Sequence, residues 1–384
     1  MENARHGTLG VAMIVVSLAA LACRVTQPKA PTVLPPPTAP AGPAEAPSTE
    51  APVLTPAVVV LAASEFRVLG LDGALLETHP APGLEYVRPN TAQVVGRSIY
   101  YVASDPDGSG EVVRRITPSE TVDLEFTAGG GFGGLTFAVS DDESRIAWTR
   151  ADWSGDWPTT ELWTANLDGS APNLVAATDE ADDIAEYFVL EAVRWLPDGD
   201  LVYAWQVTGI GGYILFFGWS SLYRFDIETS STTPLVALGP EVTAPCWTGV
   251  TDDGGPVVGA CGEGSGVVER AVASGVELPL PIVPDQGQAG AAVYAPSGER
   301  FAYAIARGNP DDEAGQVVLV PSRGAAPVVL ARHAPGAFHR IVWLDEESMA
   351  AGYWVEAAEY VDLITVDGTR SPLGEGSLVG VMWR

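Results

Sequence analysis

The sequence predicts an all-β protein, a seven-bladed β-propeller of four-stranded antiparallel blades that is closed by a C-terminal strand. Three observations lead to this prediction. The 384 residues include 42 Gly and 31 Pro, which favours many short elements over long helices. Turn-forming stretches recur at nearly constant spacing. The last eight residues, SLVGVMWR, alternate as a β-strand does but have no adjacent partner strand in the sequence.

Two kinds of turn recur along the chain. The first follows an apolar run and enters an alternating strand, as in SDDESRIAW (140–148), LPDGDLVYAW (196–205), TDDGGPVVGAC (251–261), APSGERFAYAI (295–305) and LDEESMAAGYW (344–354). The second occurs seven times, as FRVLGLDG (66–73), VVRRITPS (112–119), LWTANLDG (162–169), LYRFDIET (222–229), VERAVASG (268–275), VVLVPSRG (317–324) and DLITVDG (362–368). Steps of 44 to 60 residues between copies are typical of a four-stranded propeller blade with loop insertions.

These two signatures resemble the TolB-like repeat family, WD-like bacterial β-propellers, over about residues 57–384. The second blade departs from the pattern, with only Gly96-Arg97 at its first turn, and the fifth has Cys261 in place of an aromatic residue. The resemblance implies that the loops joining strands two and three of each blade, and those joining consecutive blades, gather on one face. That face is usually the binding face.

The first repeat unit lacks a first strand. AVVVLAAS (57–64), FRVLGLDG (66–73) and ALLETH (74–79) correspond to the second, third and fourth strands of a blade. We expect SLVGVMWR to supply the missing strand and to pair with 57–64, which removes the open sheet edges. The alternative is a packed or disordered C-terminal tail.

Charge excludes one class of partner. There are 49 acidic and 20 basic residues, Lys29 is the only lysine, and the net charge is −29. Such a chain repels phosphate backbones, so we expect no nucleic-acid partner. The charge favours solubility, with binding of a cation or a basic partner as the alternative.

The N-terminal segment predicts export. Arg5 and His6 precede an apolar stretch from Val11 to Ala22, the length of a signal-peptide core and too short for a comfortable membrane span. Because Cys23 follows, residues 1–22 resemble a lipoprotein signal peptide, although Ala20 stands where that family usually has Leu. The resemblance implies acylation of Cys23, and Arg24 beside it favours the outer membrane. Ordinary secretion or a periplasmic location, and an uncleaved anchor, are the alternatives.

A tether is expected after the cysteine. Residues 23–56 are rich in Pro, Ala and Thr and cannot build a core, so they should form an extended, disordered, semi-rigid linker. The predicted organisation is therefore a signal peptide (1–22), a tether (23–56) and a propeller (57–384).

Aromatic residues in two long loops are candidates for partner binding. The fourth blade inserts QVTGIGGYILFFGWSS (206–221) and the third inserts RADWSGDWPTT (150–160), near an acidic connector at 178–188. An exposed aromatic cluster rimmed by carboxylates suits a protein, peptide or carbohydrate. The candidates are Trp153, Trp157, Tyr213, Phe216, Phe217 and Trp219. The alternative is that YILFFGW packs as buried structure.

Two further features have a structural alternative. Cys246 and Cys261 flank a predicted hairpin and fall opposite one another, which places them within reach of a disulfide, with buried free thiols as the alternative. SDPDGSGE (104–111) offers Asp105, Asp107 and Glu111 as a weak calcium candidate, with an ordinary turn as the better interpretation. We expect no other metal and no cofactor.

A catalytic apparatus is not apparent. Four histidines form no spaced ligand set, and no G-x-S-x-G elbow occurs. We therefore expect a monomeric, non-catalytic binding or protein-interaction module at the bacterial cell envelope. The alternatives are a propeller enzyme acting on a carbohydrate or lactone, which needs carboxylates, His or Arg around the central channel, and a structural spacer domain.

Overall fold

The structure is a computed structural model, and it describes residues 54–384 apart from 85–86, 89, 106–109, 131–133, 153–158, 179–187, 208–215, 217, 238–246, 261–265, 282, 284–286, 308–312 and 357. The described residues belong to one compact unit, Val53–Arg384. None of them forms a helix with the length and apolar character needed to cross a bilayer.

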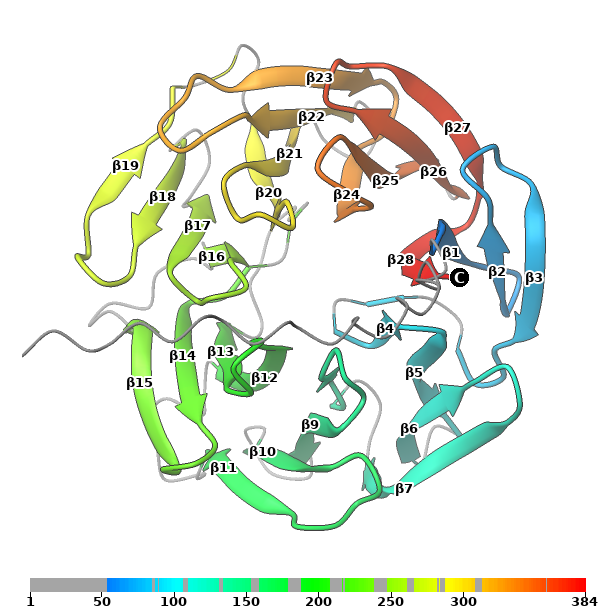
Figure 1. Cartoon of the computed structure of the whole chain (residues 1–384), viewed down its shortest axis with the longest axis vertical. Coiled ribbons are helices and arrows are strands. Elements are labelled where there is room, and N and C mark those ends of the chain that lie inside the picture. Colours follow the sequence, from blue (N-terminus) through cyan, green and yellow to red (C-terminus); the bar gives the residue numbers. More distant parts are fainter. Residues whose placement is uncertain are drawn as a thin grey trace, which may run out of the picture. The chain divides into compact units, whose positions relative to one another are not determined.

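Seven four-stranded antiparallel sheets follow one another around a ring, as predicted (Figure 1). In each sheet the innermost strand is named first. Blade 1 consists of β28 (Ser377–Trp383), β1 (Pro56–Ala62), β2 (Glu65–Leu69) and β3 (Leu75–Pro80). Blade 2 consists of β4 (Ala92–Val95), β5 (Ser98–Ser104), β6 (Gly110–Ile116) and β7 (Thr121–Gly130). Blade 3 consists of β8 (Phe137–Val139), β9 (Arg145–Asp152), β10 (Thr159–Asn166) and β11 (Asn173–Ala177).

The remaining four blades repeat the same order of strands. Blade 4 consists of β12 (Phe188–Trp195), β13 (Leu201–Val207), β14 (Ser221–Asp226) and β15 (Ser231–Val236). Blade 5 consists of β16 (Trp247–Val250), β17 (Pro256–Ala260), β18 (Val267–Ala271) and β19 (Glu277–Pro279). Blade 6 consists of β20 (Gln288–Tyr294), β21 (Phe301–Arg307), β22 (Ala314–Val320) and β23 (Val328–His333). Blade 7 consists of β24 (Phe338–Trp343), β25 (Ser348–Val355), β26 (Ala358–Thr365) and β27 (Arg370–Glu375).

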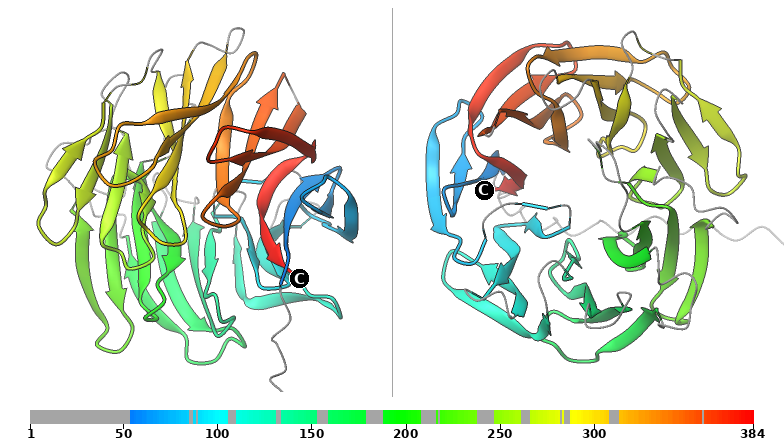
Figure 2. Two further views of the ribbon diagram at one scale, coloured as in Figure 1. Left: turned by 45° about the horizontal axis from the view of Figure 1, so that its top comes forward. Right: turned by 180° about the vertical axis from the view of Figure 1, so that it is seen from behind.

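The C-terminal strand closes the ring, as predicted. β28 pairs antiparallel with β1, with Val58 opposite Val381 and Val60 opposite Leu378. At the end of this seam, Thr55 and Arg384 exchange backbone hydrogen bonds of 2.9 and 3.1 Å. Blade 1 is thus built from both ends of the described chain, which lie side by side (Figure 2).

The core lies between the blades. Clusters of buried apolar side chains fill the interfaces between consecutive sheets, as where Phe66 of blade 1 meets Tyr101 of blade 2 with ring centroids 5.2 Å apart. Middle strands such as β21, FAYAIAR, are buried on both faces and therefore lose the alternation of a half-exposed strand. Outer strands such as β11 keep exposed residues.

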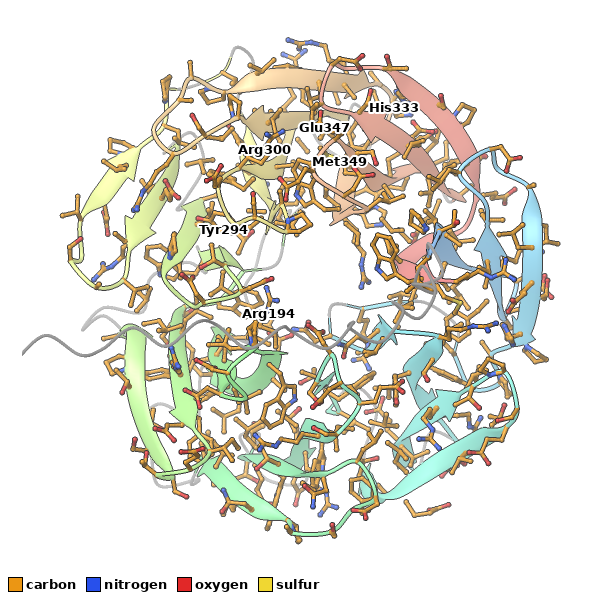
Figure 3. All side chains as sticks on the ribbon, viewed as in Figure 1. Arg194, Tyr294, Arg300, His333, Glu347 and Met349 are labelled. Atoms are coloured by element: carbon orange, nitrogen blue, oxygen red, sulfur yellow. The ribbon has the colours of Figure 1, made fainter. Side chains whose placement is uncertain are left out.

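Similar polar contacts link neighbouring blades at several junctions. Trp195 and Trp343 end the inner strands of blades 4 and 7, and their indole N–H groups donate to the carbonyls of Ala138 and Val293 in the preceding blades at 2.9 and 3.0 Å. Arg300 and Glu347 approach each other within 3.8 Å across the junction of blades 6 and 7 (Figure 3).

The two faces of the ring differ in their connections. Because each sheet is antiparallel, short turns joining strands one to two and three to four lie on one face, here called the turn face. The two-residue turn at Gly96-Arg97 belongs to it. Connections between strands two and three, and between blades, lie on the opposite face, here called the loop face. The seam between Thr55 and Arg384 ends on the turn face.

Candidate functional site

A cavity of about 450 Å³ lies where the inner strands begin, at the loop-face end of the central channel. Its volume is in the range of small-molecule sites. Side chains from blades 1, 4, 5, 6 and 7 and the connector before β4 line it. The polar lining residues are Asn90, Glu191, Gln206, Thr248, His339, Arg340, Glu359 and Ser377, and the aromatic ones are Phe216, Trp219 and Trp354.

A β-bulge places two consecutive polar residues of β24 in this cavity. The pairing of β24 with β25 shifts register between Phe338 and Arg340, so that His339 is the extra residue. In a regular strand neighbouring side chains point to opposite faces, whereas a bulge re-aims one of them. His339 and Arg340 therefore both line the cavity.

The blade 4 wall of the cavity holds a buried carboxyl group. Glu191 lies on β12, and its two oxygens accept hydrogen bonds from Asn90 Nδ2 at 2.9 Å and Trp219 Nε1 at 2.5 Å. Burial raises the pKa of Glu191 to about 7, because it outweighs the lowering effect of the two neutral donors. This residue therefore changes charge near neutral pH.

The blade 7 wall brings a second carboxyl group close to an imidazole and a guanidinium. Glu359 Oε2 lies 3.3 Å from His339 Nε2, and the His339 ring stacks on Trp354 with centroids 4.7 Å apart. Burial favours a higher pKa for Glu359, but polar contacts with His339 and Ser377 and the charges of His339 and Arg340 outweigh it and lower the pKa. Glu359 is thus ionised at neutral pH.

Two atoms on the blade 7 wall lack hydrogen-bond partners. They are His339 Nδ1 and Glu359 Oε2, and the contact of this oxygen with His339 Nε2 lacks the geometry of a hydrogen bond. Buried polar atoms are nearly always satisfied, by protein or by water. This wall is therefore only partly satisfied by the described residues.

The described members of the predicted aromatic cluster lie at this cavity. Phe216 is half-buried and packs against apolar residues of blades 6 and 7. It approaches Gly290 of β20 so closely that a Cβ there would lie 2.4 Å from Phe216 Cβ. Trp219 and Trp247 form an antiparallel bridge with N–O distances of 2.7 and 3.0 Å. Phe216 and Trp219 of the blade 4 insertion thus contact blades 5, 6 and 7.

Several predicted site residues lie outside the described residues. They are Cys23, Asp107, Trp153, Trp157, Tyr213, Phe217, Cys246 and Cys261. The lipidation, the disulfide and the partner-binding role of these aromatic residues therefore stay predictions.

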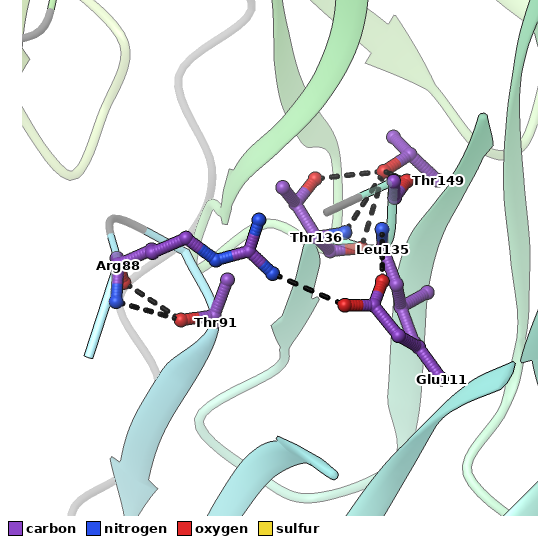
Figure 4. Close-up of polar contacts among 7 residues, drawn as sticks. Arg88, Thr91, Glu111, Leu135, Thr136 and Thr149 are labelled. Atoms are coloured by element: carbon purple, nitrogen blue, oxygen red, sulfur yellow. Dashed lines mark hydrogen bonds and ion pairs between the residues drawn. The ribbon is translucent and has the colours of Figure 1, made fainter. Parts of the chain in front are cut away.

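The remaining two residues of the calcium candidate have different surroundings. Asp105 is exposed, whereas Glu111 is buried and accepts hydrogen bonds from Arg88 Nη2 at 3.3 Å and Leu135 N at 3.0 Å (Figure 4). Within the described ranges, no three His, Cys, Asp or Glu side chains gather as a metal site would require. The contacts of Glu111 have a structural role, since they join the connector before β4, β6 and the residues before β8.

Four residues of this cavity are not predicted from the sequence: Glu191, His339, Arg340 and Glu359. Glu359 lies near the start of β26, the third strand of blade 7, whereas the other three residues lie inside mostly apolar inner strands, FVLEAVRW and FHRIVW. A charged residue in such a strand must face either the core or the channel, and the channel is the less costly environment.

Comparison with known proteins supports the fold. No family model and no curated protein matches the sequence. Among solved structures, a protein from Lactobacillus plantarum is 14% identical, with 86% of this chain and 100% of that chain covered and a TM-score of 0.54. An oligogalacturonate lyase in complex with manganese is 11% identical, with coverage of 78% and 82% and a TM-score of 0.51. TolB from Acinetobacter baumannii is 11% identical, with coverage of 85% and 81% and a TM-score of 0.45. At these identities the likeness shows the β-propeller fold and no activity.

Proposed function

We propose that this protein is a lipid-anchored propeller of the bacterial cell envelope that binds a small polar ligand at the mouth of its central channel. The observation that supports this proposal is the 450 Å³ cavity at the loop face, with polar groups on opposite walls. Blades 4 and 7 are three positions apart in a ring of seven, so Glu191 faces His339 and Arg340 across the axis. A concave site with a few convergent polar groups is typical of ligand binding.

A cavity-filling variant tests this proposal. Gln206 lies near the end of β13 and lines the cavity, so Gln206→Trp should occupy the space a ligand needs. Purified wild type would be screened by thermal unfolding against sugars, sugar acids, amino acids and short peptides. We expect at least one compound to raise Tm in the wild type and not in Gln206→Trp.

A matched control introduces a tryptophan side chain outside the cavity. Leu174 is 45% exposed on the outer strand β11, so Leu174→Trp should respond to the ligand as the wild type does. A compound that stabilises all three proteins equally binds outside the cavity and contradicts the proposal. A screen in which no compound raises the Tm of the wild type also contradicts it.

The anchor is a separate part of the proposal, based on the N-terminal sequence. Labelled palmitate should enter the wild-type protein in bacterial cells and not a Cys23→Ser variant. Equal labelling of both proteins, or labelling of neither, would contradict acylation at Cys23.

The same proposal extends to a macromolecular partner that inserts a side chain into the cavity. A pull-down from envelope extract would compare wild type with a Phe216→Ser, Phe217→Ser, Trp219→Ser variant. An identical set of captured proteins argues against the blade 4 insertion as the partner site.

A second candidate function is catalysis on a carbohydrate or a lactone. The opposite pKa shifts of Glu191 and Glu359 favour it, because pairs of groups whose environments drive their pKa values apart commonly act as acid and base. Release of p-nitrophenol from aryl glycosides, and opening of simple lactones, would be measured for wild type, Glu191→Gln and Glu359→Gln. Turnover that survives both substitutions would remove this candidate.

A further inference from the structure

Arg340 lines the channel cavity, and no carboxylate among the described residues is in direct contact with it. Its Nη2 donates to the backbone carbonyls of Val379 at 2.9 Å and Ala92 at 3.4 Å. In the part of the chain that the structure describes, its only other influence from a charged group is the through-space attraction of Glu359. Burial lowers the pKa of Arg340 to about 10, because it outweighs the attraction of Glu359.

Two other arginines of the fold pair directly with carboxylates. Arg114 forms a two-pronged contact with Asp123, and Arg370 pairs with buried Asp362. A planar guanidinium matches a carboxylate with two parallel hydrogen bonds, and this is its preferred partner. At Arg340 two backbone carbonyls accept from Nη2 alone, so the other N–H groups of this cavity-lining guanidinium are not used by these contacts.

From this contrast we infer that the ligand of the cavity is a hydroxylated monocarboxylate, such as a sugar acid, whose carboxylate binds Arg340. The inference rests on the proposed function and gives the chemical class of the ligand. A monoanion fits better than a phosphate or other dianion, because the ionised Glu359 beside Arg340 would repel a second negative charge.

The rest of the lining suits a hydroxylated ring. Gln206, Thr248 and Ser377 provide amide and hydroxyl groups that can both donate and accept hydrogen bonds. Thr248 Oγ1 is fixed in position by accepting from Ala292 N at 2.7 Å. The aromatic rings of Phe216 and Trp219 offer the apolar surface on which the C–H face of a sugar packs.

Matched pairs of acid and neutral sugar test this inference. Binding of D-glucuronate and D-glucose, and of D-gluconate and D-glucitol, would be measured by titration calorimetry to the wild type, Arg340→Gln and Arg340→Lys. We expect the wild type to bind at least one acid about tenfold or more tightly than its neutral partner, as a charge-assisted contact provides. Arg340→Gln should lose this preference, and Arg340→Lys should retain part of it.

The control is Arg97→Gln on the turn face, which makes the same charge change at a side chain that is 54% exposed. It should bind both pairs as the wild type does. Arg340→Lys keeps the test informative if Arg340→Gln fails to fold. Its ammonium group cannot form the two parallel hydrogen bonds of a guanidinium, so relative to the wild type it should weaken binding of the acids more than binding of the neutral sugars.

Three results would overturn the inference. They are equal or tighter binding of the neutral sugars, a preference for acids that persists in Arg340→Gln, and no binding of either acid. The Tm screen with Gln206→Trp separates these results from failure of the proposed function. If that screen finds a neutral or cationic ligand, the cavity is still a binding site, and only the inference that the ligand is a carboxylate is rejected.

Discussion

The two walls of the cavity carry the same residue type in opposite electrostatic states. On the blade 4 wall, Glu191 is buried among neutral donors, and its pKa rises to about 7. On the blade 7 wall, Glu359 lies beside His339 and Arg340, and its pKa falls. Desolvation acts on both carboxyl groups in the same direction, so the difference comes from neighbouring charge. One cavity can therefore present a proton donor and a fixed anion at the same pH.

The walls also differ in which part of the chain supports them. The blade 4 wall takes its donors from Asn90 and from Trp219 in the insertion before β14. The blade 7 wall depends on the C-terminal strand, because β28 provides Ser377 near Glu359 and the carbonyl of Val379 to Arg340. Four changes can test this contrast, and they follow in decreasing order of expected effect.

Deleting Ser377–Arg384 should have the largest effect. It removes β28, and with it the seam to β1 and the support of the blade 7 wall, so we expect loss of cooperative unfolding in circular dichroism and calorimetry. Deleting Arg384 alone removes an ion pair with Glu77 and two backbone hydrogen bonds and should lower the free energy of unfolding by only about 1 kcal/mol. A cooperative transition in the longer deletion would show that the seam is dispensable.

Glu191→Gln should remove a pH dependence from the blade 4 wall. The pKa of Glu191 is raised from 4.5 to about 7 on folding, so its stabilising contribution is complete below 4.5 and is lost as the pH rises through 7. The loss should amount to roughly 3 kcal/mol of unfolding free energy. Urea unfolding of the wild type and Glu191→Gln from pH 4.5 to 8 should show the decline only in the wild type, and parallel curves would contradict it.

Glu359→Gln should act with the opposite pH dependence on the blade 7 wall. Because the folded pKa of Glu359 is lowered, its stabilising contribution is present above 4.5 and is lost as the pH falls through the folded value. The variant should lose about 2 kcal/mol at pH 7, where the anion beside Arg340 is replaced by a neutral amide. The difference from wild type should shrink at pH 3, and a constant difference would show that the effect is one of packing.

Trp219→Phe should have the smallest effect, about 1 kcal/mol at pH 7. The indole N–H donates to Glu191 Oε2 and lowers the pKa of that carboxyl group, so its removal should raise this pKa further. Trp343→Phe is the matched control, since it removes a donor to the Val293 carbonyl, which does not titrate. The cost of Trp219→Phe should grow with pH and that of Trp343→Phe should not.

The β-propeller could be predicted from the sequence because a turn is determined by residues that are neighbours in the chain. Asp-Gly turns and alternating strands can be recognised in short stretches of sequence. Their spacing predicted seven blades and the pairing of the C-terminal strand with the first blade. The cavity depends on distant residues: Asn90 and Glu191 are 101 positions apart, and Glu191 and Trp219 are 28 apart. The exposure of His339 and Arg340 to one cavity follows from a bulge that the letters FHRIVW do not specify. Phe216 and Trp219 were recognised, but as a surface cluster rather than as part of the channel lining.

The meeting of Thr55 and Arg384 has a consequence for how the chain can be rearranged. Their backbones are hydrogen bonded on the turn face, so a short linker could join them and new ends could be opened elsewhere. The exposed turn at Ser322–Arg323–Gly324, between β22 and β23, is a suitable place for the cut. Such a circular permutant would hold blade 1 together covalently and move the break to blade 6, while every residue of the cavity kept its place.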